Sequence, residues 1–182
     1  SYADDMLKST LKLLDDNEAD IKLQEFIELF RYLTDKDIFE NTYKNYLCKR
    51  LLNSQKSYND DLEKAMLSKL KAECGYQFTS KLEGMFTDVQ LSKSLMTKFR
   101  SNNLYTILQQ ETNVTDIDVN LIATGFWPIQ TNKPCNLPID IEKCCTIFND
   151  FYTSKHEGRK MTWMTSHGSA EIKGNYITSN GS

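Results

Sequence analysis

Apolar residues recur every three or four positions through most of the first hundred residues, a spacing that places them on one side of a helix. Successive stretches carry Leu23, Phe26, Ile27, Phe30 and Leu33; Phe39, Tyr43, Tyr46, Leu47 and Leu51; Leu62, Met66, Leu67, Leu70 and Cys74; and Phe78, Leu82, Met85, Phe86 and Val89. Helices that are apolar on one side must bury that side against one another. The sequence therefore predicts a mainly α chain, with a helical bundle of the four-helix type over residues 1–115.

Polar residues and a glycine mark the ends of these stretches. The run 57–60 offers an N-cap for the third stretch, and Gly75 offers its C-terminal stop. A weaker opening helix is predicted around residues 2–11. Residues 95–99 either extend the fourth stretch or follow a kink in it.

The pattern changes after residue 115. Apolar and polar residues alternate over 116–123, which is the period of a strand. The prolines, Pro128, Pro134 and Pro138, then mark a loop that no helix can cross. A further helix carries Ile141, Cys144, Cys145, Phe148 and Tyr152 on one side.

Two short alternating runs, 161–163 and 170–176, flank turn residues and predict an antiparallel hairpin. We therefore expect a small, incomplete α/β subdomain over 116–178. Residues 179–182 are interpreted as a cloning remnant.

The predicted sheet is too small to pair all of its backbone groups. Three short strands leave N–H and C=O groups free at an edge, so the sheet either continues in further sequence or accepts a strand from a partner. The candidate partner-binding residues are Val119 and Leu121 on the first strand and Met161 and Trp163 on the hairpin, with Trp127, Ile172 and Tyr176 as support. Alternation alone does not say which of them face the partner, because a register slip of one residue reverses every assignment.

Two further features have both a structural and a partner-binding interpretation. Trp127 and Trp163 are either core residues or flank the surface where a strand adds. The basic stretch 155–160 is either a helix C-terminus with favourable cations or a contact patch.

Composition and spacing argue against several classes of site. The 22 Lys and Arg residues are interspersed with 25 Asp and Glu, for a net charge of −3, so we expect neither a nucleic acid nor a membrane as partner. His156 and His167 are the only histidines, and neither stands at zinc-ligand spacing with a cysteine or carboxylate. No phosphate-binding glycine motif is present. We therefore expect no metal and no cofactor.

The five cysteines form no C-x-x-C pair, and their odd number leaves one without a partner. This usage is typical of reduced thiols and indicates the cytoplasm or nucleus.

Several motifs can be recognised in order along the chain. They are DKDIFE at 35–40, LCKRLL at 47–52, MLSKLKAECG at 66–75, FTSKLEGMFTD at 78–88, GFWP at 125–128 and KHEGRKMTW at 155–163. Together they resemble the C-terminal homology region of the cullin family, most closely the cullin-3 type and next the cullin-4 type. Cys48 is a departure, because cullins usually carry a small residue there.

The resemblance implies a fold and a role. In cullins this region forms a four-helix bundle and the start of an α/β subdomain, into which a RING-box protein inserts a strand. The RING recruits a ubiquitin-charged conjugating enzyme, and a long N-terminal arm, absent from this sequence, holds the adaptor and substrate receptor. The cullin is then a non-catalytic scaffold of a ubiquitin ligase that fixes the distance between the reactants.

Two other functions remain open from the residues alone. One is a thiol-dependent hydrolase that uses Cys74 or Cys145 with a histidine. The other is a stand-alone helical interaction module that never joins a ligase. Thiol reactivity separates the first from a scaffold, and binding of an added strand separates the second.

Overall fold

The computed structural model describes residues 2–53, 59–129 and 135–165 and divides them between two units. The first unit contains residues up to Asn102 together with Ile117–Ile129, and the second contains Asn103–Asp116 and the residues after 129.

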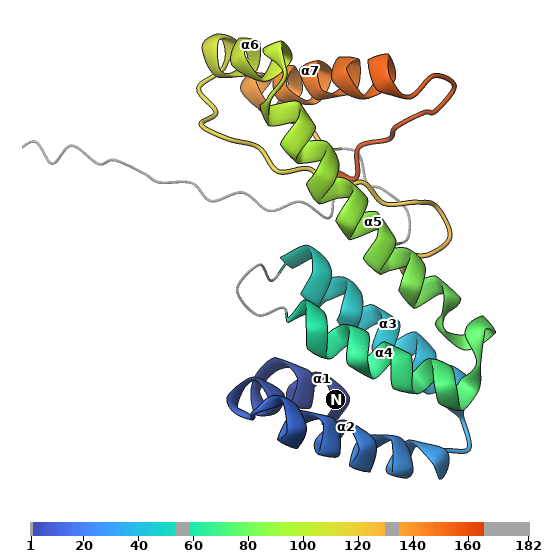
Figure 1. Cartoon of the computed structure of the whole chain (residues 1–182). Coiled ribbons are helices and arrows are strands. Elements are labelled where there is room, and N and C mark those ends of the chain that lie inside the picture. The colour runs from blue at the N-terminus through green and yellow to red at the C-terminus, as the bar shows by residue number, and fades with distance from the viewer. Residues whose placement is uncertain (1, 54–58, 130–134, 166–182) are drawn as a thin grey trace, which may run out of the picture. The chain divides into compact units, whose positions relative to one another are not determined.

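The first unit is a helical bundle, coloured blue to green in Figure 1. It comprises α1 (Tyr2–Asp5), a π-helical turn (Met6–Thr10), a 3-10 turn (Leu11–Leu13), α2 (Asp16–Arg31), α3 (Lys36–Asn53), α4 (Asp60–Cys74) and α5 (Tyr76–Arg100). The predicted helical content is confirmed, and α5 runs unbroken through residues 95–99. The opening helix is present at the expected place but consists of three short turns of different helical type.

The apolar stripes meet in one core. Its fully buried side chains include Leu23, Phe30, Leu47, Met66, Leu70, Leu82 and Met85. Such a side chain contributes about 1.5–3 kcal/mol when it leaves water. Aromatic rings line part of the core: Phe39 lies edge-on to Phe30 at 4.9 Å between centroids. Burial of these apolar side chains is thus the main interaction that holds the helices together.

The helix ends follow local chemistry. The Asn59 side chain accepts hydrogen bonds from the backbone N–H groups of Asp61 (3.1 Å) and Leu62 (3.3 Å), which caps α4 as predicted. At the other end of α4, Gly75 has φ = +82° and ψ = 176°, a conformation that side chains disfavour. The chain therefore turns into α5 immediately after α4 ends.

A buried ionic cluster lies within this bundle. Arg50, which is 1% exposed, donates hydrogen bonds to both carboxylate oxygens of Glu63 and to Asp4. The hydroxyl of Tyr43 donates to Glu63 (3.0 Å), and Lys8 donates to Asp4 (2.7 Å). Burial alone would raise the pKa of Asp4, but the bonds from Lys8 and Arg50 outweigh it, so this pKa lies below its ordinary value. The cluster joins residues 2–13 to α3 and α4.

The second unit consists of α6 (Asn103–Glu111) and α7 (Ile139–Lys155), which pack against each other, with the segment that follows α7. Leu108 of α6 is buried, as are Cys144, Phe148, Phe151 and Tyr152 of α7. The helix at α7 is confirmed. A separate helix at α6 was not predicted. Its apolar residues Leu104, Ile107 and Leu108 do have helical spacing, but α6 is only nine residues long.

The strand predicted over 116–123 is not formed in the part of the chain that the structure describes. These residues lie in no helix, strand or turn. The N–H groups of Leu121 and Ala123 and the carbonyl of Ile117 bind side chains of α5. The predicted hairpin is largely outside the described residues, and 161–163 are not in a strand. The mainly α class is thus confirmed, while the α/β subdomain stays a prediction.

Candidate partner interface

The segment Ile117–Ile129, named the extended segment after its residues 117–123, which lie in no helix or turn, belongs to the first unit. It lies against α5, although more than fifteen residues separate the two in sequence (Figure 1). Trp127 and the partly buried Ile122 and Ile129 pack against the apolar core of the bundle. The bundle therefore supplies a fixed surface for a segment with no helix or strand of its own.

Two polar side chains of α5 bind the backbone of this segment. Ser92 accepts a hydrogen bond from the N–H of Leu121 (2.8 Å), and its own hydroxyl lies 3.1 Å from the Leu121 carbonyl and 2.8 Å from the Asp88 carbonyl. Asp88 Oδ2 accepts from the Ala123 N–H and from the Trp127 indole N–H, both at 2.7 Å. Asp88 and Ser92 are 8% and 2% exposed, so these bonds are shielded from water.

The contacts follow one row of positions along α5. Gly84 and Arg100 extend the row that contains Asp88 and Ser92, because each position is four residues from the next or a multiple of four. Arg100 donates to the carbonyl of Ile117 (3.1 Å). At the other end, a Cβ added at Gly84 would lie 2.6 Å from the Phe126 ring. Gly84 therefore gives the segment room for its closest approach to the helix.

The backbone of the segment has two different edges. The groups that bind α5 come from Ile117, Leu121 and Ala123, all odd-numbered. In an extended chain the N–H and C=O of one residue point to the same edge, and those of the next residue point to the opposite edge. The even-numbered residues therefore direct their backbone away from α5. Within the described residues, the backbone groups of Asn120 and Ile122 make no hydrogen bond.

The structure places the predicted site residues in different parts of the chain. Val119 and Leu121 lie half-buried on the extended segment, and Trp127 is buried with its indole on Asp88. Met161 and Trp163 belong to the second unit, where the Trp163 ring lies edge-on to Phe148 at 5.9 Å.

Ile172 and Tyr176 lie outside the described residues. The partner-binding role of all seven residues stays a prediction.

Sequence reasoning did not single out Asp88 and Ser92. The available signal was their position: Val89 and Met96, next to them on the same helical stretch, are buried apolar residues. A polar residue inside an apolar stripe needs a hydrogen-bond partner. Its partner was not identifiable, because the segment that supplies the N–H groups begins almost thirty residues later.

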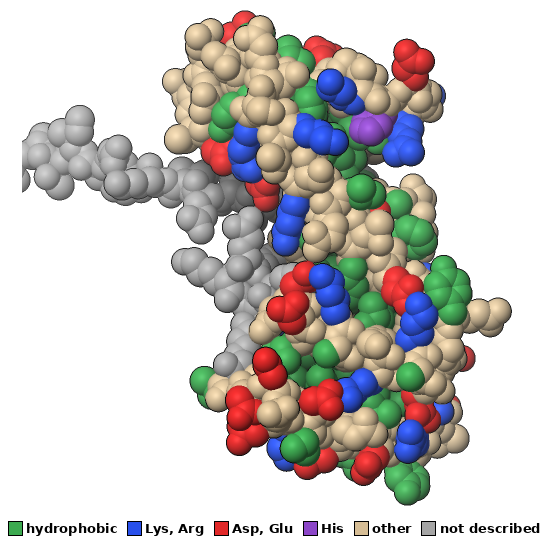
Figure 2. All heavy atoms as spheres, in the orientation of Figure 1, with side chains coloured by type: hydrophobic (Ala, Val, Ile, Leu, Met, Phe, Trp, Pro, Cys, Tyr) green, Lys and Arg blue, Asp and Glu red, His purple; other side chains and the backbone are tan. Residues whose placement is uncertain are grey.

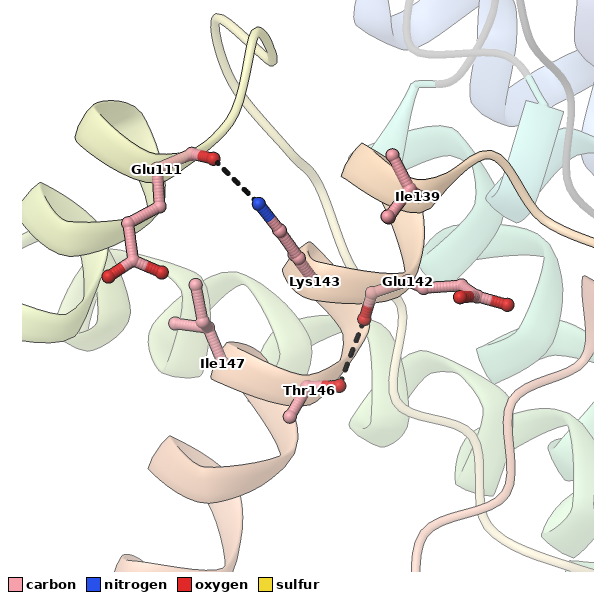
Figure 3. A pocket seen from close by; sticks show the side chains of 6 residues that line it. All are labelled: Glu111, Ile139, Glu142, Lys143, Thr146 and Ile147. Atoms are coloured by element: carbon pink, nitrogen blue, oxygen red, sulfur yellow. Dashed lines mark hydrogen bonds between the residues drawn. The ribbon is translucent and has the colours of Figure 1, made fainter.

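A concave site lies in the second unit. An open hollow of about 290 Å³ lies between the end of α6 and the first turns of α7, and Figure 3 shows the residues that line it. Lys143 reaches across it to the carbonyl of Glu111 at 3.4 Å, and the remaining lining residues are Ile139, Glu142, Thr146 and Ile147. It is shallow and brings together no nucleophile and base.

The thiols lack the properties of a catalytic nucleophile. Burial raises the pKa of Cys74, Cys144 and Cys145, whereas a reactive cysteine needs a lowered pKa. His156 follows Cys145 by eleven residues at the end of the same helix, about 16 Å along its axis. The described coordinates therefore provide no dyad of Cys145 with His156.

No group of three or more His, Cys, Asp or Glu that could hold a metal ion occurs among residues 2–53, 59–129 and 135–165. No helix in the described ranges combines the length and apolar character needed to cross a bilayer. Acidic and basic side chains are interspersed over the visible face of the first unit (Figure 2).

Comparison with known proteins gives matches over nearly the whole chain. Residues 1–96 match the family model described as the cullin alpha solenoid domain, and residues 121–181 match the cullin alpha+beta domain. Cullin-3 of Dictyostelium discoideum is 47% identical over 177 residues, which are 96% of this chain and 22% of the relative. Cullin-3 of Caenorhabditis elegans is 45% identical and Cullin-4A of Mus musculus 41%, each over 175 residues with the same coverage. The chain thus spans about a fifth of the length of these relatives.

Proposed function

Because the chain belongs to the cullin family, we propose that it is a scaffold segment of a cullin-RING ubiquitin ligase and that it accepts a strand from a RING-box protein. The scaffold holds the RING-box protein, and through it the ubiquitin-charged conjugating enzyme, at a fixed distance from the substrate. Such a scaffold contributes proximity rather than chemistry. We place the complex in the cytoplasm and nucleus.

One observation carries the proposal: the extended segment has a backbone edge that points away from α5. Asn120 and Ile122 have no backbone hydrogen bonds within the described part of the chain, while the N–H groups of Leu121 and Ala123 are bound to α5. An extended edge of this kind is where a partner strand adds, because main-chain hydrogen bonds supply the affinity.

The side chains of the segment indicate the chemistry of the added strand. Ile117, Val119 and Leu121 are apolar and half-buried, whereas Asp118 and Asn120 are polar and exposed. A strand paired alongside would continue both faces, since cross-strand neighbours lie on the same face of a sheet. We therefore expect a partner strand with apolar residues at alternate positions and polar residues between them.

The adaptor and substrate receptor would contact the scaffold through an N-terminal arm outside these 182 residues. A hydrolase function is not proposed, because burial raises the pKa of the Cys74 and Cys145 thiols, whereas a catalytic thiol needs a lowered pKa. A stand-alone interaction module is the outcome that would follow if no strand adds.

The test is binding of a RING-box protein to a longer form of the protein that continues through the sheet. Asn120→Pro removes one outward N–H, at a position where neither it nor the preceding residue lies in a helix or turn. We expect affinity to fall about tenfold or more, since one ladder hydrogen bond is lost and the ring obstructs the edge.

Asn120→Ala is the matched control, because it removes the exposed side chain and keeps the N–H. It should bind like the wild type. Equal affinity of the proline and alanine variants, or no binding by the wild type, would remove this edge from the interface and favour the stand-alone module.

A further inference from the structure

We infer that Asp88 and Ser92 are positioning residues that take the place of a neighbouring strand, holding residues 117–123 extended and in register before any partner arrives. This inference rests on the proposed function, because it concerns the edge that accepts the added strand. It assigns to α5 a role in partner binding without direct contact between α5 and the partner.

The hydrogen bonds reproduce what one strand does for the next. In a sheet, alternate residues of a strand exchange N–H and C=O bonds with the neighbour. Here the Leu121 N–H binds Ser92 and the Ala123 N–H binds Asp88, so two successive odd-numbered residues are fixed from one side. Ser92 also lies within hydrogen-bond distance of the Leu121 carbonyl (3.1 Å). The side chains of Asp88 and Ser92 on α5 therefore occupy the position that an adjacent strand would have in a sheet.

Asp88 additionally sets the register of the segment. Its Oδ2 accepts from both the Ala123 N–H and the Trp127 indole, which lie four residues apart on the chain. No Lys or Arg pairs with Asp88 among the described residues, so the segment itself supplies its hydrogen-bond donors. Buried carboxylates need such donors, and bonds to a charged acceptor are stronger than neutral ones. A shift of the segment by one residue would break both bonds.

Holding the segment in advance should strengthen partner binding. A disordered segment loses backbone freedom when a strand adds, and that loss weakens the complex. When the segment is already held against α5, its backbone freedom is lost when the protein folds and not when the partner binds. The affinity of the partner then depends on residues that lie behind the edge that it touches.

The test compares Ser92→Ala and Asp88→Asn with Ser94→Ala, a serine-to-alanine control at an exposed position of the same helix. In the partner-free protein, hydrogen exchange is measured at the Leu121 and Ala123 amides. We expect exchange about tenfold faster at Leu121 in Ser92→Ala and at Ala123 in Asp88→Asn, because each loses or weakens one shielded hydrogen bond.

Amides in the middle of α5, such as that of Val89, report whether the bundle remains folded. If Asp88→Asn does not fold, the inference is tested by Ser92→Ala alone, since this variant removes only one hydroxyl group. Unchanged exchange at Leu121 in a folded Ser92→Ala variant would refute the inference.

The second measurement is the affinity of the wild type and variants for a RING-box protein. We expect binding about three- to tenfold weaker in the variants and unchanged in Ser94→Ala. If the wild type does not bind, the proposed function fails while the exchange result stands. If the wild type binds and variants with fast exchange bind equally well, the positioning role is wrong and the proposed function stands.

Discussion

Replacement of Arg50 by methionine should destabilise the first unit more than any other single change of charge that we predict. Arg50 is 1% exposed and bonds to both oxygens of Glu63 and to Asp4. Methionine has a similar length but no charge. Glu63, itself 2% exposed, would retain only the Tyr43 hydroxyl at 3.0 Å. A buried carboxylate without its cation typically costs about 3–5 kcal/mol, which is the loss in unfolding free energy that we expect.

Removal of both partners should cost much less. In the double variant Arg50→Met with Glu63→Met, no unpaired carboxylate remains at position 63, and Asp4 keeps its bond from Lys8 at 2.7 Å. The main unpaired polar group is then the Tyr43 hydroxyl, whose burial without a partner costs about 1–2 kcal/mol. The double variant should therefore be more stable than Arg50→Met alone, although it lacks one more polar group.

The assay is urea unfolding followed by Trp127 fluorescence in a Trp163→Phe background, so that the signal reports the first unit. Arg31→Met is the control, because Arg31 makes a comparable ion pair with Glu73 at 2.9 Å on the surface. Water and ions screen exposed pairs, so its midpoint should barely change. The reasoning is refuted if Arg50→Met shifts the midpoint no more than Arg31→Met, or if the double variant is less stable than the single one.

The remaining predictions concern pH, backbone conformation and thiol reactivity. The pKa of Asp4 is lowered in the folded protein, so the carboxylate stabilises the fold fully at pH values above the ordinary aspartate pKa. This stabilisation is lost as the pH falls through the folded-state pKa. The urea midpoint of Asp4→Asn should therefore depend less on pH over this acid range than that of the wild type. Gly75→Ala should lower the unfolding free energy by about 1–3 kcal/mol, measured by urea unfolding, because φ = +82° is strained for alanine. The exposed thiol of Cys135 should react with a thiol reagent in the native protein, whereas the buried Cys144 should react only at the rate of unfolding; rapid native labelling of Cys144 would contradict its burial.

The helices of the bundle were predictable because their signal is local. Burial of one side requires the spacing seen at Leu23, Phe26 and Phe30, and these residues do lie in the core. In α6 the same signal is short, because only Leu104, Ile107 and Leu108 carry it over nine residues. So few positions do not separate a short helix from a loop that contains apolar residues.

The extended segment shows a different limit of sequence reasoning. Alternation over 116–123 predicted a strand, and the structure places these residues in no helix or strand, with Val119 and Leu121 half-buried. Alternation could not reveal what the backbone binds, because an N–H group bonds equally well to a strand carbonyl or to the Asp88 and Ser92 side chains. The partner-binding residues therefore stay a prediction, and Asp88 and Ser92, which hold the segment, were not predictable from its alternation.

The ion pair between Arg50 and Asp4 has a consequence for biosynthesis. Asp4 precedes its partner by 46 residues, so at roughly 5–20 residues per second it is synthesised about 2–9 s before Arg50. During that interval residues 2–13 lack the Arg50 cation that pairs with the buried Asp4 carboxylate in the folded protein. This contact within the first unit therefore forms only after α3 has been translated.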